Sequence, residues 1–172
     1  MNVVLNAALF QAGWWGCVLG AAHGHATWGV IVAAAVIAWH LARAARPRRE
    51  LALASIAALA GALFENALLR SAWVRYAYDG ASLAAAPLWI VAMWPLFATT
   101  LNVSLRALRT HPWIAAFVGL AGGPAAYYAG ARLGALELVS PGNALAAIAA
   151  GWAILTPALC AAARRFDGYP RP

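Results

Sequence analysis

Apolar residues run through this chain in six long stretches that are separated by short polar connections. A helix needs about 20 mostly apolar residues to cross the hydrocarbon core of a bilayer, and each stretch approaches or exceeds that length. We therefore predict an all-α fold, a polytopic membrane protein whose six transmembrane helices form one domain over residues 1–172. The predicted spans are Asn2–Ala22, Thr27–Ala42, Leu51–Ala72, Pro87–Leu108, Trp113–Leu133 and Ala144–Ala163.

The first apolar stretch has the position of a secretory signal peptide but not its pattern. No basic residue precedes Arg43, and Asn6 and Gln11 interrupt a long apolar run. A cleaved signal has a basic start and a short apolar core. We therefore expect a retained helix.

The basic residues predict the orientation of these helices, because cytoplasmic loops are enriched in them. All twelve are arginines. With a cytoplasmic N-terminus only Arg70, Arg75 and Arg132 lie outside, so both termini are predicted to be cytoplasmic. The arginines on the inner side are then Arg43, Arg46, Arg48, Arg49, Arg106, Arg109, Arg164, Arg165 and Arg171. Five tryptophans lie near predicted span ends, where amphipathic rings prefer the interface: Trp28, Trp39, Trp73, Trp89 and Trp113.

The composition narrows the class of protein and of partner. Hydrophobic residues make up 65% of the chain and charged residues 10%, whereas charged residues make up about 25% of a typical soluble protein. The net charge of +7 would suit nucleic acid, but the arginines lie at the ends of apolar runs, so we expect no nucleic-acid partner. The expected partners are membrane lipids, with a lipid or another small molecule as substrate. Cys17 and Cys160 fall near opposite membrane faces and are expected to be buried free thiols.

Glu65 is the first candidate for a functional residue, because the preceding segment Ser55–Phe64 carries no charge. A carboxylate at membrane depth is costly and should face protein or trapped water. Arg132 is its expected partner, since both fall in the outer half of the six-span arrangement. The other side chains available at that depth are Arg70, Tyr127, Tyr128, His23 and His25. Two interpretations remain open, a static buried ion pair and a carboxyl group that takes up and releases protons.

Polar residues in the first and fourth stretches indicate contacts between helices. In the first, one face carries Asn2, Asn6, Gly13, Cys17 and Gly20. Gln11 points to the opposite side, so we expect protein around this helix. In the fourth, a polar stripe at helical spacing consists of Pro95, Thr99, Asn102 and Arg106. Hydrogen bonds between Asn6 and Asn102 would satisfy both amides and hold two helices together.

The fifth stretch is rich in glycine. Gly119 and Gly123 form a G-x-x-x-G pair, and Gly130 and Gly134 repeat it. Such pairs let helix backbones approach closely. Pro124 removes a backbone donor and should kink the helix. Close packing is the first interpretation, and a broken helix that builds a site near the membrane midplane is the second.

The histidines do not make a metal site by themselves. His23 and His25 would need Glu65 as a third ligand, and no further histidine or cysteine stands at ligand spacing. His40 and His111 are expected beside arginines in the headgroup region. The sequence contains no phosphate loop, nucleophile elbow, metalloprotease motif or CxxC motif. We therefore predict no metal and no cofactor.

Three segments carry a resemblance to a known family: Leu5–Trp14, Trp89–Leu105 and Gly122–Ala135. Together they resemble a family of bacterial inner-membrane proteins known as domain of unknown function 2878 (DUF2878). The third stretch departs from the family pattern, where an aspartate with a small hydroxyl neighbour is expected and Glu65 and Asn66 stand instead. The resemblance implies a small multi-pass protein and no particular activity. Members of that family often lie near genes for cyclopropane-type fatty-acid modification, and this gene context favours the handling of membrane lipid.

The function we favour is that of an accessory in membrane-lipid modification or envelope maintenance, acting through a polar pocket inside the membrane. Two alternatives stay open: a small proton-coupled transporter that uses Glu65, and an integral membrane enzyme on lipid substrates with Glu65 or a tyrosine as acid or base. A pocket open sideways to the bilayer would favour lipid handling, and a vestibule from one aqueous face would favour transport. The candidate lining residues are Asn6, Gln11, Glu65, Asn66, Thr99, Asn102, Tyr127 and Arg132.

Overall fold

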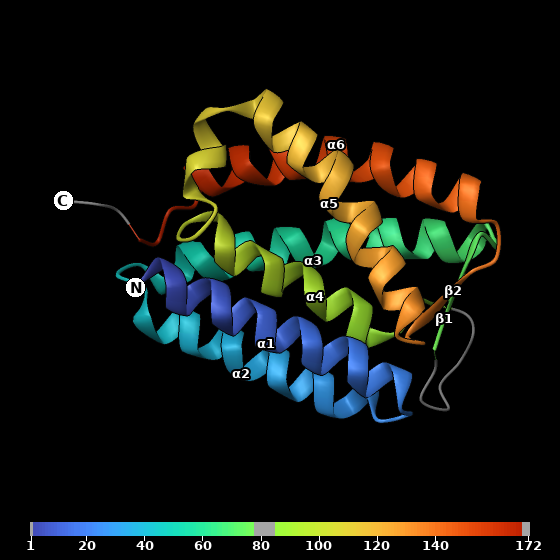
Figure 1. The fold of residues 1–172 in the computed structure, drawn as a ribbon. Helices are drawn as coiled ribbons and strands as arrows, with labels where there is room; N and C mark the ends of the chain where they lie inside the picture. Colours follow the sequence, from blue (N-terminus) through green and yellow to red (C-terminus); the bar gives the residue numbers. More distant parts are fainter. Residues whose placement is uncertain (1, 78–84, 170–172) are drawn as a thin grey trace.

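The computed structural model describes residues 2–77 and 85–169, and these residues form a bundle of helices (Figure 1). Arg171, which entered the orientation argument, lies outside them. Two short strands, β1 (Val74–Tyr76) and β2 (Leu136–Leu138), pair in antiparallel register. The helices are α1 (Val3–Ala22), α2 (Ala26–Arg43), α3 (Pro47–Arg70), α4 (Leu88–Leu101), α5 (Pro112–Arg132) and α6 (Pro141–Arg165), and a 3₁₀ helix, η1 (Arg106–Thr110), precedes α5.

Five of the helices in the described residues are long and apolar enough to cross a membrane, namely α1, α2, α3, α5 and α6. Their outer faces carry large apolar side chains such as Leu59, Phe117 and Ile154, each more than 60% exposed. Surfaces of this kind suit lipid and would be unfavourable in water. The chain is thus a multi-pass membrane protein.

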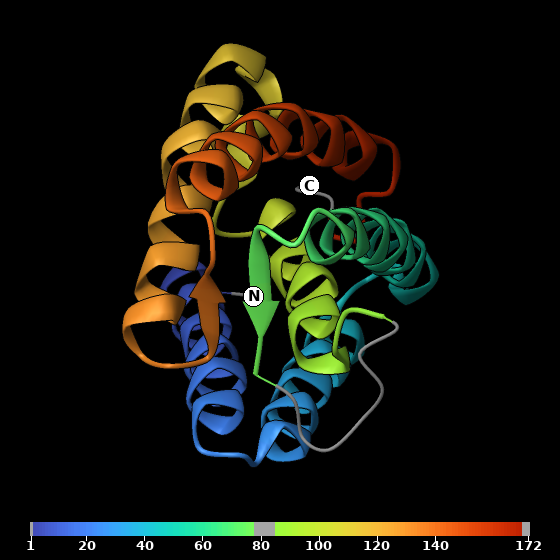
Figure 2. The same cartoon turned by 90° about the vertical axis from the view of Figure 1, so that its right-hand side faces the viewer.

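The fourth predicted span is corrected, because α4 ends at Leu101 and has 14 residues. A helix that is exposed to lipid needs about 20 residues to cross a bilayer, and α4 is shorter than that. α4 instead lies inside the bundle, where it contacts α1, α2, α3 and α6 (Figure 2). The helix ends here because side-chain hydrogen bonds hold the chain that follows it. The Ser104 N–H donates to Asn6 Oδ1 at 3.1 Å, and Asn102 Nδ2 donates to Glu50 Oε1. The predicted stripe therefore does not continue along one helix to Arg106.

The helices pack largely as sequential pairs, with α1 along α2, α3 along α4 and α5 along α6. The N-terminus, the α2–α3 connection and the end of α6 lie at one end of the bundle, which we call the terminal end (Figure 1). β1 and β2 lie at the opposite end, which we call the hairpin end. They join the α3–α4 connection to the α5–α6 connection, and Arg75 on β1 pairs with Glu137 on β2.

The first helix does not have protein on all sides, contrary to our expectation. α1 packs against α2 and α4, and Val4 and Trp15 on its other side are exposed. Its buried face carries Asn6, Gly13 and Cys17, as the polar stripe predicted. Both cysteines of the chain are free and buried, which confirms that prediction.

The glycine pattern of α5 has two different causes. A Cβ on Gly119 would lie 2.2 Å from the Trp152 carbonyl oxygen, and a Cβ on Gly123 would lie 2.4 Å from Trp152 Cγ. α5 therefore packs closely on α6 at these two glycines. Gly134 follows the end of α5 with φ of +88°, so glycine serves a left-handed turn there. Pro124 stands inside α5, which runs as one helix to Arg132.

Candidate functional site

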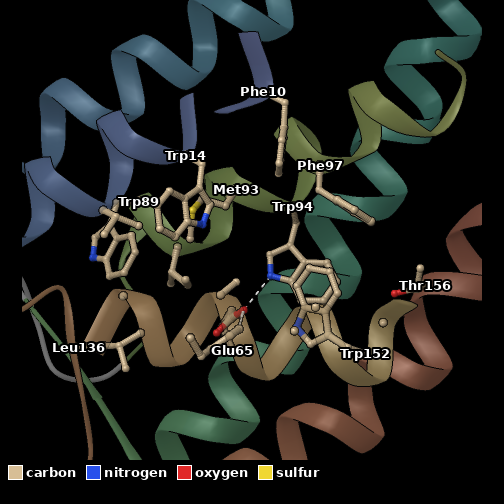
Figure 3. Close-up of a pocket in the computed structure, with 18 of the residues that line it drawn as sticks. Phe10, Trp14, Glu65, Trp89, Met93, Trp94, Phe97, Leu136, Trp152 and Thr156 are labelled. Atoms are coloured by element: carbon tan, nitrogen blue, oxygen red, sulfur yellow. Dashed lines mark hydrogen bonds between the residues drawn. The ribbon is translucent and has the colours of Figure 1, made fainter. Parts of the chain in front are cut away.

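A cavity of about 330 Å³ lies between α1, α4 and α5, with side chains of α3 and α6 in its deeper wall (Figure 3). This volume is within the range of about 300–1,000 Å³ that is usual for small-molecule sites. Aromatic side chains make up much of the lining: Phe10, Trp14, Trp89, Trp94, Phe97 and Trp152. They are brought together because α4 runs through the middle of the bundle and presents side chains to α1 and α6.

Glu65 lies in the wall of this cavity and is completely buried. Its Oε2 accepts a hydrogen bond of 2.6 Å from the Tyr76 hydroxyl, and its Oε1 accepts one of 2.7 Å from Trp94 Nε1. The Tyr127 hydroxyl also donates to Oε1. β1, α4 and α5 therefore each supply one donor to a carboxylate on α3. This arrangement meets the need of a buried carboxylate for hydrogen-bond partners.

The predicted pair of Glu65 with Arg132 is wrong. Arg132 is the last residue of α5 and its side chain is exposed at the hairpin end. Within the described residues no arginine or histidine lies within ion-pair distance of Glu65. The two tyrosines and Trp94 satisfy the carboxylate, so that a counter-charge is not what holds it in the bundle.

Only part of the predicted pocket lining is found together. Gln11, Glu65 and Tyr127 line the cavity. Asn66 instead donates to the Ala62 carbonyl at 2.7 Å and accepts from the Ala86 N–H at 3.0 Å, which fixes the approach to α4.

The amides near the terminal end lie outside the cavity. Asn6 donates to the Thr99 carbonyl at 3.1 Å, and the Thr99 hydroxyl donates to the Leu96 carbonyl. Asn102 donates to Glu50, so Asn6 and Asn102 take separate partners instead of the predicted mutual bond. These residues hold α1, α3 and α4 together, which is the structural role that buried amides often have in membrane proteins.

The cavity opens sideways, between α1 and α5. Its rim includes Gln11, Val118 and Gly122, which are exposed. Gln11 lies near the middle of α1, and Val118 and Gly122 lie near the middle of α5. α5 packs along α6 and makes few contacts with α1. A Cβ on Gly122 would meet nothing within 4 Å, so this side of the cavity is open.

One polar atom in the cavity wall has no hydrogen-bond partner among the described residues, although it is buried. It is Thr156 Oγ1 on α6. Gly119 and Gly123 allow α6 to approach α5 closely enough for Trp152 and Thr156 to reach the cavity. Buried polar groups without partners are rare, and a bound molecule is one reason for them.

The sequence indicated few of the aromatic residues in this wall. Trp89 was expected at the membrane interface, but it is only 1% exposed and its Nε1 donates to the Ala77 carbonyl at 3.1 Å. Trp28, Trp39 and Trp113 are exposed near helix ends, in agreement with the expectation. The sequence did offer one signal for buried tryptophans. It contains nine tryptophans in 172 residues, and only five of them lie near predicted span ends.

A second group of buried polar residues lies at the terminal end, and the sequence indicated its members Asn102 and Arg106 but not its acids Glu50 and Asp167. We call it the terminal cluster, and its centre is Glu50, which is 2% exposed. His40 Nε2 lies 2.8 Å from Glu50 Oε2, and Asn102 Nδ2 and the Gly168 N–H each donate to Oε1 at 2.7 Å. His40 is thus buried, which corrects its expected place in the headgroup region, whereas His111 is exposed.

Two arginines complete the terminal cluster through Asp167. Arg106 and Arg109 both form ion pairs with its Oδ2, the second at 3.0 Å. Burial by itself would raise the pKa of Asp167, but hydrogen bonds from Arg109 and the Tyr169 N–H, together with both arginine charges, hold the pKa below its usual value. Burial raises the pKa of Tyr169 to about 12, with the Glu50 charge acting in the same direction.

The loop histidines are engaged by the backbone. His23 Nδ1 lies 2.8 Å from the Leu19 carbonyl oxygen, and His25 Nδ1 lies 2.7 Å from the carbonyl oxygen of His23. Glu65, the third ligand considered above, is bonded elsewhere. No group of three histidine, cysteine or acidic residues that could hold a metal ion occurs in residues 2–77 and 85–169.

Comparison with known proteins supports the resemblance seen in the sequence. Neither the curated proteins nor the solved structures contain a match to this chain. Residues 3–158, which include every residue of the cavity lining, match one protein family. The chain belongs to that family, described as Protein of unknown function (DUF2878).

Proposed function

We propose that this protein holds a membrane lipid or a related amphiphile in the cavity between α1 and α5, as an accessory in membrane-lipid modification or envelope maintenance. The observation that carries the proposal is the position of the exposed rim. Gln11 and Gly122 lie near the middle of their helices, so the cavity opens at the depth of the hydrocarbon core. An apolar chain can enter from the bilayer at that depth without crossing water.

The two alternative functions have less support from the cavity. A transporter requires a route from Glu65 to an aqueous face, but no described residue of the terminal cluster lines the cavity. Toward the hairpin end, Tyr76 and Leu136 are buried beside it. An enzyme would require a reactive group, and Glu65 is bonded to three donors that hold it in place.

Photo-cross-linking tests whether the cavity binds lipid. The purified protein is reconstituted with a phospholipid that carries a diazirine on its acyl chain, and the labelled peptides are identified. Gly122→Leu is the blocking variant, because the open rim accepts a side chain there. Ala125→Leu is the control, since Ala125 is exposed on the same helix and lies outside the cavity lining. We expect labelling of cavity residues in the control and its loss in Gly122→Leu. Equal labelling of both variants, spread over all outer faces, would show boundary lipid only.

Lipid composition of a deletion strain tests the wider role. We expect the strain to differ from the parent in its acyl chains or headgroups, and we expect Ala125→Leu to restore the parental pattern. Gly122→Leu should fail to restore it at equal abundance. An unchanged lipid composition in the deletion strain would count against a role in lipid modification.

We further propose that the protein lies in a bacterial inner membrane with both termini in the cytoplasm. The support is the distribution of arginines, since Arg70, Arg75 and Arg132 are the ones at the hairpin end. Cysteines introduced at Arg46 and Ser140, after replacement of the two native cysteines, test it with a membrane-impermeant thiol reagent on intact cells. Only the Ser140 site should react, and reaction at Arg46 alone would reverse the orientation.

A further inference from the structure

The lining of the cavity contains an acidic residue and no basic one. The acid is Glu65, and no arginine, lysine or histidine of the described residues contributes to the lining. Its three partners are hydroxyl and indole groups that carry no formal charge. A carboxylate oxygen pair offers about four acceptor positions, of which these donors occupy three. The wall of the cavity therefore contains a carboxyl group that has no basic partner among the described residues and has a free acceptor position.

The aromatic side chains add to this electrostatic character. The faces of tryptophan and phenylalanine rings are electron-rich and attract cations, and rings around a quaternary ammonium group are a recurrent binding arrangement. Trp94 and Trp152 stack with ring centroids 4.8 Å apart, and Trp94 also holds Glu65. Trp14 and Trp89 approach from the other side of the cavity (Figure 3). A headgroup that carries negative charge and no ammonium group would meet Glu65 and the ring faces unfavourably.

We infer that the cavity binds the cationic head of an amphiphile, an alkylammonium group that lies beside Glu65 while its apolar chain leaves between α1 and α5. This inference rests on the proposed function, because it uses the same sideways opening. Glu65 lies in the half of α3 that approaches the hairpin end, so the head would reach it from the leaflet on that side. The chain would then run toward Phe10 and Phe97.

A buried hydroxyl on α6 restricts the chemistry of the ligand further. The Thr156 hydroxyl has no partner among the described residues and can donate a hydrogen bond. A ligand with an oxygen acceptor near its ammonium group would satisfy this hydroxyl, as a phosphatidylethanolamine does and a plain alkylamine does not. The shared chemistry is the ammonium group, and the two sources of it can be separated by experiment.

The first arm compares single-chain ligands of equal length. Dodecylammonium and dodecanol are titrated against the protein in an uncharged maltoside detergent, with tryptophan fluorescence as the readout because four tryptophans line the cavity. We expect dodecylammonium to bind about tenfold more tightly than dodecanol. Glu65→Gln should remove this difference in affinity between the two ligands. Ala125→Leu should behave as the unchanged protein.

Trp14→Leu is a second variant, which tests the proposal even if Glu65→Gln does not fold. Trp14 is half-buried and makes none of the Glu65 hydrogen bonds, so its replacement removes an aromatic face and keeps the carboxylate in place. We expect a loss of about threefold to tenfold in affinity for dodecylammonium and a smaller loss for dodecanol. If both variants keep the unchanged preference for the cation, the carboxylate and the rings do not select the ligand.

The second arm distinguishes the sources of the ammonium group. Native mass spectrometry of protein reconstituted in equal parts of phosphatidylethanolamine and phosphatidylglycerol should show bound phosphatidylethanolamine, reduced by Gly122→Leu. Binding of dodecylammonium without enrichment of phosphatidylethanolamine would assign the site to free lipophilic amines. Equal affinity for dodecanol and dodecylammonium would overturn the inference and leave the lipid-binding proposal standing. Absence of all binding, with no effect of Gly122→Leu, would overturn both.

Discussion

The backbone N–H of Gly168 donates a hydrogen bond of 2.7 Å to Oε1 of Glu50, although 118 residues separate the two. The same turn is held a second time, because the Arg46 N–H donates to the Gly168 carbonyl at 3.1 Å. The chain after α6 therefore folds back over the terminal end and closes it with backbone groups. Asp167, the residue before Gly168, also holds this segment through its ion pairs with Arg106 and Arg109.

Replacement of Gly168 should open this contact. A Cβ at Gly168 would lie 2.5 Å from Glu50 Cγ and 2.8 Å from the Arg46 carbonyl oxygen, so Gly168→Ala forces the segment away. Overpacking of this kind costs about 1–3 kcal/mol. We expect a lower melting temperature in detergent and faster digestion of the C-terminal segment by carboxypeptidase. Gly142→Ala is the control, because a Cβ at Gly142 meets nothing within 4 Å. Equal behaviour of the two variants would show that the segment does not depend on this contact.

The terminal cluster should weaken in acid through Asp167. Its pKa in the folded protein lies below the ordinary value of 3.8. A carboxyl group with a lowered pKa stabilises the fold at pH values above its unfolded pKa, and this contribution is lost as the pH falls through the folded pKa. Digestion of the C-terminal segment should thus be equal at pH 7 and pH 5 and should increase below about pH 4. Asp167→Asn should raise digestion at neutral pH and reduce the increase in acid. An increase already present between pH 7 and pH 5 would assign the effect to another group.

Replacement of Gly123 by a larger residue should weaken the packing between α5 and α6. A side chain there would overlap the indole of Trp152, whereas Ala125 is exposed on the same helix. Close van der Waals contact is the main force between such helices, because lipid tails are as apolar as the side chains. We expect Gly123→Leu to lower the melting temperature in detergent by several degrees relative to Ala125→Leu, about 1–3 kcal/mol of stability. Equal melting temperatures would show that the helices can separate there without loss.

The helices were predictable because their signal is local. An apolar run and its limiting proline or arginine lie within one segment, and the predicted spans agree with the observed helices except where α4 ends early. β1 and β2 were not predicted, since three residues of alternating apolar and charged character give too little pattern. Glu65 was recognisable as a candidate because a single acid stands out in an apolar run.

The partners of these residues were only partly predictable, because they come from distant parts of the chain. Depth alone made Tyr127 available to Glu65 but did not select it over Arg132. The donors to Glu65 stand 11, 29 and 62 residues away on three different elements. The similar predicted depth of Glu65 and Arg132 suggested that they pair. Arg132, however, is the last residue of α5, and its side chain is exposed at the hairpin end. Glu50 follows Arg48 and Arg49 in a polar connection, and its burial depends on the chain that returns after α6.

Glu65 should couple in stability to its hydrogen-bond donors and not to Arg132. Tyr76→Phe leaves Oε2 of a buried carboxylate without its donor, which costs about 1–3 kcal/mol. Glu65→Gln removes the charge that this donor serves, so the double variant should lose less stability than the sum of the two single variants, by about 0.5–3 kcal/mol. Arg132→Gln changes an exposed side chain, and we expect an effect within about 0.5 kcal/mol.

The measurement is a pair of double-mutant cycles by chemical denaturation in mixed micelles, one for Glu65 with Tyr76 and one for Glu65 with Arg132. The first cycle should show coupling and the second should be additive within error. Coupling between Glu65 and Arg132 together with additivity between Glu65 and Tyr76 would contradict the hydrogen-bond network described here. In that case the carboxylate would be held by an ion pair, and its availability to a cationic ligand would be lost with it.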